Sequence, residues 1–494
     1  MPFNSLGFIF IFLPTTILGY FTINKISTHN SAKIWIIVSS LIFYSYYSIS
    51  YVPIILASIV INFIIGRLLQ NRKNIKSLSN SKFKYKLLFF IGICVNIILL
   101  GFFKYINFLL DTINIVTHSD FHGIAIALPL AISFYTFQQI SFLADSYTHK
   151  TTESKFLDYC FFVLFFPQLI AGPILRYREL IPQFIKKNRY IDWDNMATGS
   201  FVFCSGLFKK VVIADSFAAM SLVMLGTEQN IGFLDSWIAS LCYSFQLYYD
   251  FAGYSDMAIG AGLMFNIKLP LNFNSPYCAQ NIQEFWRCWH ITLSRWLRDY
   301  VYIPLGGNRK GANRTLLNIF VTFLIGGIWH GAGWTFVIWG ILHGTALAVH
   351  RIWKIMGLKM NSFWGSITTF MFINFAWVFF SSVTVKEAVT RIKGMFGLNG
   401  HLTILEEITH YYEKLKLLKM SNPHDMPVFY LVIFSIAVFI IPNTMQMINF
   451  IPYKGIFEFN TDLKHAFALG IIFFLAFMTF VGEAGQSNFI YFQF

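Results

Sequence analysis

The stretch Trp329-His330-Gly331-Ala332-Gly333-Trp334 separates two apolar runs, Leu317–Ile328 and Thr335–Leu342. Runs of this kind are typical of helices that cross a lipid bilayer. An ionisable imidazole at that depth is costly, and such residues are usually retained because they serve a function. The flanking glycines allow a ligand to approach the backbone closely. We therefore take His330 as the candidate reactive centre, although a histidine there can also simply hydrogen-bond to a neighbouring helix.

The composition predicts a membrane protein. Of the 494 residues, 56% are hydrophobic and only 12% are charged, which is about half the charged fraction of a soluble protein. The apolar residues form continuous runs that do not alternate with polar ones, so helices are expected rather than a β-barrel. We predict an all-α, polytopic integral membrane protein with about 10–12 transmembrane helices, plus re-entrant and interfacial helices around a central funnel or tunnel.

The domain organisation follows from the same pattern. Residues 1–494 show no internal repeat and no linker, which indicates a single membrane domain. Between about 160 and 350 the apolar pattern is repeatedly broken, and irregular backbone at membrane depth is tolerated only where protein or a wet cavity surrounds it. We predict a functional core there, supporting helices at 1–150 and 360–485, and a C-terminal tail at 489–494.

The net charge of +14 does not indicate nucleic-acid binding, because the basic residues lie in short loops between apolar runs. The segment Arg67–Lys86 holds seven basic residues and no acidic one. This pattern fixes the orientation of membrane proteins and predicts a cytoplasmic loop. The partner that this charge indicates is the lipid bilayer.

The cysteines and the glycine-rich motifs give no sign of a cofactor. The six cysteines are scattered, mostly in apolar runs, and none forms a CxxC pair. This predicts inert buried thiols and supports neither a disulfide framework nor a metal site. No P-loop and no GxGxxG motif occurs, so we expect no bound nucleotide cofactor.

The segment Gln283–Asp299 has the spacing of an amphipathic helix. Its apolar residues recur at helical steps, and its polar residues recur at steps of three and four on the other side. The polar stripe consists of Arg287, His290, Ser294 and Arg298. Either this is an interfacial helix with a row of arginines reaching toward water, or His290 faces a cavity and meets His330 from the next span.

Two carboxylates in an apolar run need an explanation. We expect Asp250 and Asp256 to be buried, and a buried carboxylate without a partner is strongly unfavourable. They therefore either form structural ion pairs or line a path. Further along, Asn274 lies in Asn272–Tyr277, which reads as a Pro-punctuated turn that leads into the Trp-rich helix.

A basic cluster follows that turn, with Asp299 as its only acid; its members are Arg287, Arg295, Arg298, Arg309, Lys310 and Arg314. Phosphate groups of a nucleotide-bearing ligand suit such a rim. The orientation of a loop explains it equally well. The chain ends in Phe489-Ile490-Tyr491-Phe492-Gln493-Phe494, a water-averse tail that we expect to pack into protein or lipid.

Five ordered blocks carry a family resemblance that covers nearly the whole chain. They are Phe166–Pro173, Tyr249–Asp256, Phe285–Ser294, Tyr302–Gly307 and Trp329–Trp334. Together they resemble the membrane-bound O-acyltransferase family, in particular its bacterial polysaccharide branch of alginate and peptidoglycan O-acetyltransferases and the teichoic-acid D-alanyl enzyme. The family usually has two arginines before the Trp-His pair at Trp289-His290; here Cys288 stands in place of the second.

The resemblance implies roles for single residues. His330 corresponds to the family's invariant histidine and is expected to act as general base. His290 corresponds to its second polar position and is expected to assist, for example by stabilising an oxyanion. Tyr491 is expected to relay the acyl group, because a phenol of pKa about 10 leaves more readily than a sugar alcohol. The candidates for lining the substrate or donor channel are Trp329, Trp334, Arg287, Ser294, Asn274 and Asp250.

The resemblance also implies a pathway. Acetyl from a cytoplasmic thioester, expected to be acetyl-CoA, crosses the bacterial inner membrane, and a periplasmic SGNH-hydrolase-like acetyltransferase passes it to a glycan. Peptidoglycan is favoured over alginate. Three alternatives remain open: D-alanyl-type transfer to another cell-wall polymer, a transporter or flippase in which the histidines and aspartates form a path, and a non-enzymatic scaffold.

Overall fold

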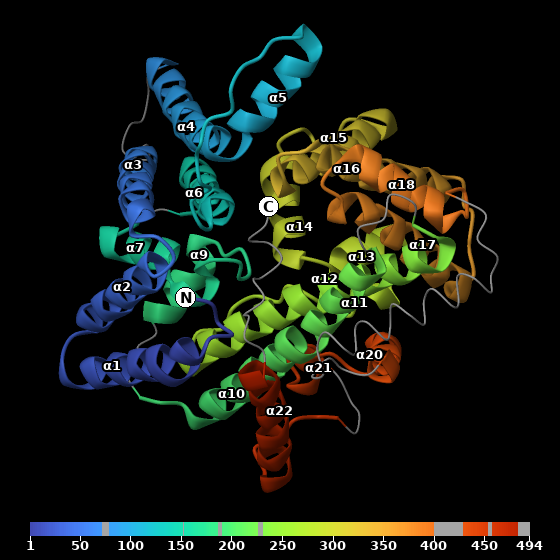
Figure 1. The fold of residues 1–494 in the computed structure, drawn as a ribbon. Helices are drawn as coiled ribbons and strands as arrows, with labels where there is room; N and C mark the ends of the chain where they lie inside the picture. The colour runs from blue at the N-terminus through green and yellow to red at the C-terminus, as the bar shows by residue number, and fades with distance from the viewer. Residues whose placement is uncertain are drawn as a thin grey trace. The chain divides into compact units, whose positions relative to one another are not determined.

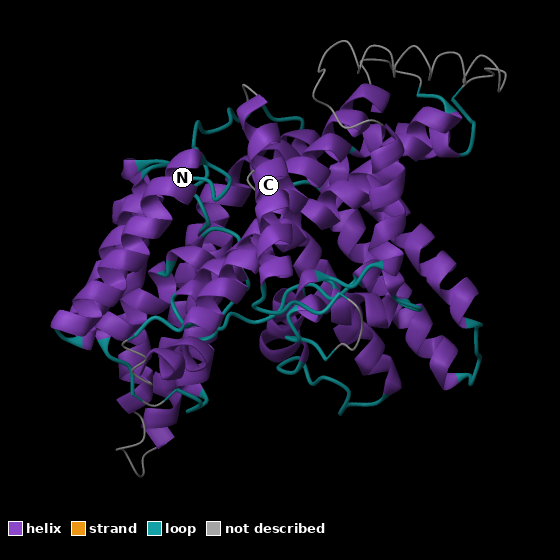
Figure 2. Cartoon of the chain, turned by 90° about the horizontal axis from the view of Figure 1, so that it is seen from below, coloured by secondary structure: helices purple, strands orange, loops and turns teal. Residues whose placement is uncertain are grey.

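The computed structural model describes residues 1–71, 79–151, 153–185, 190–225, 231–399, 428–452 and 457–482. Across these ranges every regular element is a helix, and the described residues contain no strand (Figure 2). The predicted all-α fold is confirmed. The tail at 489–494, including Tyr491, lies outside the described residues.

Six helical stretches of the described chain are long and apolar enough to cross a membrane by length and composition. They are Gly7–Ile26, Ile49–Gln70, Lys82–Thr117, Ala312–His330, Trp334–Ile355 and Ser362–Ser381. Two shorter apolar helices lie at Tyr430–Ile440 and Leu463–Thr479. Within the described residues, fewer helices meet these length and composition criteria than the 10–12 that the sequence indicates. Several apolar runs form short helices, and the 32-residue helix Phe233–Met264 is long enough but is not among the six.

The chain divides into two compact units. The first consists of Met1–Ser200 and Met257–Pro270, and the second of Phe201–Asp256 and Leu271–Phe494. The chain-order division into a core at 160–350 and supporting helices on either side stays a prediction. Figure 1 labels the helices of both units.

The first unit contains the helices α1 (Leu13–Ile26), α2 (His29–Ser45), α3 (Val52–Gln70), α4 (Ser79–Leu100), α5 (Ile106–Thr117), α6 (Ile132–Tyr147), α7 (Phe156–Leu164), α8 (Phe166–Leu169) and α9 (Tyr177–Ile185), and the start of α10 (Trp193–Phe208). Buried amides tie three of them together. Asn96 donates to Asn62 at 2.6 Å, and Asn62 donates to Gln139 at 2.8 Å. Such contacts hold helices together where the bilayer supplies no hydrophobic driving force.

The second unit contains the candidate site. Its helices are the end of α10, η5 (Lys209–Ala214), α11 (Asp215–Leu225), most of α12 (Phe233–Met264), η6 (Pro276–Cys278), α13 (Ile282–Cys288), α14 (Ile291–Leu297), η7 (Arg298–Tyr302), α15 (Ala312–His330), α16 (Trp334–Ile355), α17 (Ser362–Ser381), α18 (Val385–Met395), α20 (Val428–Ile440), α21 (Thr444–Met447) and α22 (Leu463–Gly482). The long helix α12 has 32 residues and joins two apolar runs that Asp250 interrupts in the sequence. The helix continues through Asp250 because Lys210 pairs with the carboxylate at 2.7 Å.

Helices α15 and α16 form a hairpin whose backbones touch (Figure 1). A Cβ added at Gly340 would lie 2.8 Å from the carbonyl oxygen of Phe323, and one added at Gly327 would lie 2.8 Å from the Cα of Gly340. Small residues permit this approach, as in other close-packed membrane helices. The hairpin therefore carries His330 at the end of one helix and Trp334 at the start of the next on a rigid frame.

The segment 283–299 differs from the single amphipathic helix that its spacing predicts. It forms α13 and α14, with a break at His290, whose backbone is left-handed at φ 41°. An extended strip of chain holds the break: the Asn274 amide donates to the Cys288 carbonyl at 2.9 Å, and the Ile291 amide donates to the Asn272 carbonyl at 2.9 Å. Since these bonds replace helical ones, the predicted polar stripe does not form.

Candidate active site

His330 lies at the last residue of α15 and is 4% exposed. Its ring packs edge-on against Trp339 at 5.0 Å and against Phe380 at 5.2 Å between centroids. The neighbouring Trp329 ring lies 5.0 Å away. Gly331 next in the chain admits no side chain, because a Cβ there would overlap the ring of Phe336. The imidazole thus occupies an aromatic cage in which electrostatic interactions are strong.

His290 is fully buried and lies near the same tryptophan. Its ring centroid is 6.5 Å from Trp329 and 4.8 Å from Phe251, which it meets edge-on. Trp329 therefore contacts both imidazoles. The two histidines that the sequence separates by forty positions are brought to one cluster, although through a broken helix and not through a helical face.

The tautomer of His290 follows from its partner Asn272. Thr292 directs its backbone N–H at 3.4 Å and its hydroxyl at 3.0 Å to the side-chain oxygen of Asn272. That oxygen accepts, so the His290 Nδ1 atom 2.9 Å away must carry the proton and donate. The other ring nitrogen, Nε2, then presents a lone pair, and it has no hydrogen-bond partner among the described residues.

The charge state of His290 points the same way. It lies outside the six candidate spans, and burial lowers its pKa to about 3. A buried imidazole with this pKa is neutral at physiological pH. In the tautomer above it accepts a hydrogen bond at Nε2. It is therefore suited to orienting a hydroxyl nucleophile and unsuited to donating to an oxyanion.

His343 is a buried histidine that the sequence reasoning missed. It lies on α16 and is fully buried. Trp286 donates its indole N–H to His343 Nδ1 at 3.2 Å, and the Trp339 ring lies 4.5 Å from the imidazole. A signal was present in the sequence: Trp339 and His343 are four residues apart, and such residues share one face of a helix.

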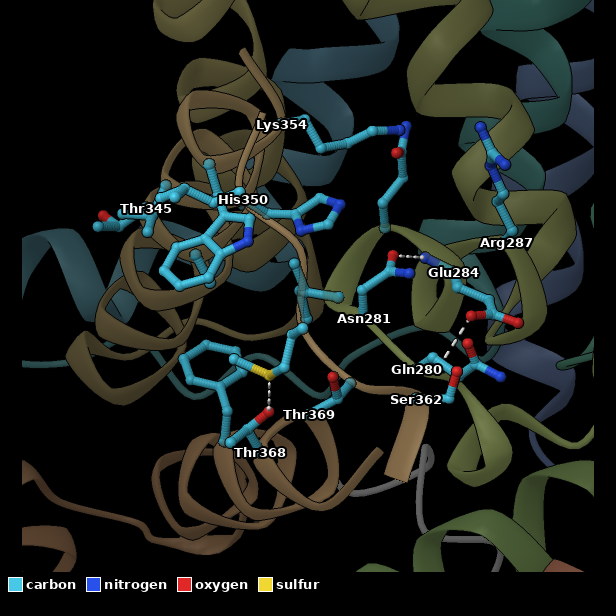
Figure 3. Close-up of a pocket in the computed structure, with 18 of the residues that line it drawn as sticks. Gln280, Asn281, Glu284, Arg287, Thr345, His350, Lys354, Ser362, Thr368 and Thr369 are labelled. Atoms are coloured by element: carbon cyan, nitrogen blue, oxygen red, sulfur yellow. Dashed lines mark hydrogen bonds between the residues drawn. The ribbon is translucent and has the colours of Figure 1, made fainter. Parts of the chain in front are cut away.

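A cavity of about 820 Å³ opens beside this cluster. Its lining comes from α13, α16 and α17 and the segments next to them, and includes the predicted channel residue Arg287. In Figure 3 the labelled Arg287, His350 and Lys354 occupy one side of the view, and the hydroxyl residues Ser362, Thr368 and Thr369 occupy the other. The cavity thus has Arg287 and Lys354 on one side and hydroxyl residues on the other, with the carboxylate of Glu284 also in its lining.

A series of packed aromatic side chains lies between the cavity and His330. Neither His330 nor His290 is among the described residues that line the cavity. The lining residue Phe372 packs edge-on against His343 at 5.4 Å, and His343 leads through Trp339 to His330. A ligand in the cavity is therefore separated from His330 by a layer of aromatic side chains.

The remaining predicted channel residues are dispersed. Trp329 is 5% exposed and central, whereas Trp334 is 50% exposed at the start of α16. The Ser294 amide donates to the His290 carbonyl in the first turn of α14. Asn274 accepts from Asn443 at 3.0 Å. Trp334, Ser294 and Asn274 are not among the described residues that line the cavity.

Asp250 belongs to a buried ion-pair network. Lys210 contacts Asp250 at 2.7 Å and Asp215 at 2.9 Å. Lys209 contacts Asp256 at 2.7 Å and donates to Thr444 at 2.6 Å. Of the two readings of these carboxylates, the contacts favour the structural ion pairs.

The potential metal-ligating side chains of the described residues do not resemble a metal site. Within the described residues no group of three His, Cys, Asp or Glu side chains gathers in a way that could hold a metal ion. The six cysteines are all free thiols. Burial raises the pKa of Cys288 to about 11, so this thiol beside the histidine break is protonated and a poor nucleophile.

Comparison with known proteins finds similar sequences. A family model described as membrane-bound O-acyltransferase matches residues 145–386. A peptidoglycan O-acetyltransferase of Helicobacter pylori is 41% identical over 100% of this chain and 97% of the relative. A probable alginate O-acetylase of Azotobacter vinelandii is 39% identical over 80% of this chain and 78% of the relative. A teichoic acid D-alanyltransferase of Bacillus subtilis is 29% identical over 51% of this chain and 68% of the relative.

Proposed function

This chain belongs to the membrane-bound O-acyltransferase family, and on that premise we propose that it passes acetyl groups across the bacterial inner membrane for the O-acetylation of peptidoglycan. As a member it is a multi-pass membrane O-acyltransferase. The observation that carries the proposal is the 41% identity to a peptidoglycan O-acetyltransferase over essentially the full length of both proteins. The alginate O-acetylases match over 80% of the chain, which makes alginate the second glycan to test.

His330 is the proposed general base. It accepts the proton of an acceptor hydroxyl while the hydroxyl oxygen attacks the acetyl carbon of a thioester. The carbonyl electrons move onto oxygen and return as the carbon–sulfur bond breaks, and the proton passes from His330 to the departing thiolate. General acid–base catalysis of this kind contributes about 10²–10⁴-fold in rate. The contact of His330 and His290 with one indole ring supports a shared role.

His290 is the proposed positioning residue for that hydroxyl. Its Nε2 lone pair accepts a hydrogen bond, and its bond to Asn272 fixes the ring. Because the imidazole of His290 stays neutral at physiological pH, it orients the hydroxyl by a hydrogen bond and leaves the proton for His330.

Acetyl-CoA is the proposed donor. The support is the size of the 820 Å³ cavity and its cationic side with Arg287 and Lys354. Guanidinium and ammonium groups bind phosphates. The rest of the described lining, in which Glu284 is the one acid, is mainly uncharged and suits the rest of a long thioester. In this assignment the acetyl end passes inward beside His343 to reach His330.

A relay completes the proposed pathway. Tyr491, which lies outside the described residues, is the proposed first acceptor, because an aryl ester keeps enough driving force for a second transfer. A periplasmic SGNH-hydrolase-like acetyltransferase is the proposed second enzyme, on the strength of the family resemblance. Both proposals require that the tail reach the His330 cluster from the outer side of the membrane.

The test is chemical analysis of cell polymers. The gene is inactivated and complemented, and acetate released by mild base is measured from purified peptidoglycan and from secreted polysaccharide. Loss and recovery confined to peptidoglycan supports the proposal; loss confined to alginate-like polymer would assign the other glycan. Purified protein is also given radiolabelled acetyl-CoA. Movement of label across vesicles with the thioester intact would favour a transporter.

A further inference from the structure

Two buried N–H groups beside His330 have no acceptor within the described part of the chain. They are Nε1 of Trp339 and Nε2 of His343, on side chains that are 1% and 0% exposed. A buried donor without an acceptor is unfavourable. A native structure tolerates such a group mainly where a ligand or water completes it.

The His343 atom is a donor because its other nitrogen is occupied. The Trp286 indole can only donate, and it points its N–H at His343 Nδ1 at 3.2 Å. Nδ1 must therefore be an unprotonated acceptor. The neutral imidazole then carries its proton on Nε2, so that the group without an acceptor is an N–H and not a lone pair.

The two donors lie between the cavity and His330. Phe372 of the cavity wall packs against His343, the rings of His343 and Trp339 are 4.5 Å apart, and Trp339 packs against His330 at 5.0 Å. The cavity also receives lining from Leu342 and Thr345, on either side of His343 in α16. A thioester that extends from the cavity to His330 passes both rings.

The surroundings select a particular kind of acceptor. The rings that contact His343 belong to Trp286, Phe323, Trp339, Phe372 and Trp377, and none carries a charge. A permanent anion such as a phosphate is poorly accommodated in an apolar cage without a cation. A neutral carbonyl enters at low cost and gains strength from the donors as negative charge develops on its oxygen.

We infer that the N–H groups of Trp339 and His343 bind the acyl carbonyl oxygen of the donor and stabilise the oxyanion during transfer. This rests on the proposed function. When the hydroxyl oxygen bonds to the acyl carbon, the carbonyl electron pair moves onto the oxygen that the two donors hold. When the pair returns, the carbon–sulfur bond breaks, and His330 supplies the thiolate with the proton that it took from the hydroxyl.

The direct test compares two analogues of acetyl-CoA on the full-length protein in detergent. One replaces the thioester sulfur with CH₂ and keeps the carbonyl as a ketone; the other is S-ethyl-CoA, which has no carbonyl. In the wild type the ketone should bind about 10-fold more tightly, as expected for one or two net hydrogen bonds. In Trp339→Phe or His343→Met this ratio should fall toward one, whereas His343→Gln, which keeps an N–H, should retain part of it.

Kinetics separate this role from packing. Trp339→Phe and His343→Met should lower kcat by about 10²-fold or more, as loss of an oxyanion donor does, with a smaller change in KM. The matched controls are Trp364→Phe on the exposed side of α17 and His122→Met in an exposed loop; both should behave as the wild type.

Failure of the proposed function and failure of this inference give different results. If wild-type protein neither binds nor cleaves acetyl-CoA, the proposed function fails. If the wild type turns over the thioester and the ketone preference persists in both Trp339→Phe and His343→Met, the inference about the donors is wrong. A folded variant with a reduced kcat and an unchanged ketone preference would likewise assign these side chains to packing.

Discussion

His290 and Asn272 are joined by a 2.9 Å hydrogen bond in which the imidazole Nδ1–H donates to the amide oxygen. The bond fixes both the ring and its tautomer, because Thr292 donates to the same oxygen. Asn272 also donates from its side-chain nitrogen to Ser255 at 3.2 Å, so both the oxygen and the nitrogen of its amide form hydrogen bonds. An amide therefore determines that His290 presents a lone pair at the candidate site.

Replacing Asn272 by aspartate should make the reaction sensitive to pH. In the wild type the pKa of His290 is lowered to about 3, so this ring stays neutral from pH 5 to 8 and adds no acidic limb. A carboxylate at the same place favours the imidazolium and raises the pKa. The variant should lose activity as pH falls and recover it as pH rises, measured as kcat/KM from pH 5 to 9.

The control is Asn272→Leu, which removes the acceptor without adding charge. It should lower kcat/KM at every pH by a similar factor. A flat profile in Asn272→Asp that matches the leucine variant would show that His290 does not sense the new carboxylate.

His330→Ala should abolish acetyl transfer while the protein still reaches the membrane. Loss of a general base costs about 10²–10⁴-fold in rate. Acetyl-CoA turnover by purified protein and base-labile acetate on the glycan measure the effect, and immunoblotting of membranes checks expression. Glycan acetylation at the wild-type level would remove His330 from the chemistry.

Tyr491→Phe should stop glycan acetylation and leave donor binding unchanged, because only the phenol oxygen is lost. Peptide mass spectrometry of the wild type, trapped in the absence of the second acceptor, should detect one acetyl group on Tyr491. An unmodified Tyr491 together with an active phenylalanine variant would leave the tail with a packing role.

Lys210→Met should destabilise the protein strongly. It leaves Asp250 and Asp215 without their shared cation, and breaking a buried pair in this way costs about 3–5 kcal/mol. The double variant Lys210→Met with Asp250→Asn should recover part of the Tm measured in detergent. If both variants fold normally but lose activity, the network belongs to a path and not to the scaffold.

Gly340→Ala should disturb the α15–α16 hairpin. The added Cβ would meet the Phe323 carbonyl oxygen at 2.8 Å, and overpacking of this kind costs about 1–3 kcal/mol. A lower Tm and reduced turnover are expected. Gly470→Ala on α22, where nothing lies within 4 Å of the new Cβ, should change neither.

The sequence predicts the membrane class and the helical fold because long apolar runs are a local pattern, and one polar interruption of such a run makes His330 a candidate. It does not predict the break at His290. The spacing of residues 283–299 satisfies a helix, and the left-handed turn is imposed by Asn272, a partner eighteen residues away. Long-range side-chain contacts of this kind leave no periodic signal.

Long-range contacts also determine where the predicted channel residues lie. Trp334 and Asp250 are plausible near a site from their neighbours in sequence, but the first is half exposed and the second pairs with Lys210. His343 was overlooked because a histidine in an apolar helix looks like a packed one. The spacing from Trp339 places it on the same helix face as that ring, and the approach of α13, which brings Trp286 to its ring, adds the hydrogen bond that the sequence does not show.

The contact between the backbones of α15 and α16 has a mechanical consequence. With Gly327 against Gly340 there is no side-chain layer between the two backbones to slide or compress, so we expect the span from His330 to His343 to stay constant during turnover. We expect passage of a substrate to displace Phe372 and Phe380 on α17 instead. Distance labels placed across the hairpin should read the same value with and without donor, while labels from the hairpin to α17 should diverge.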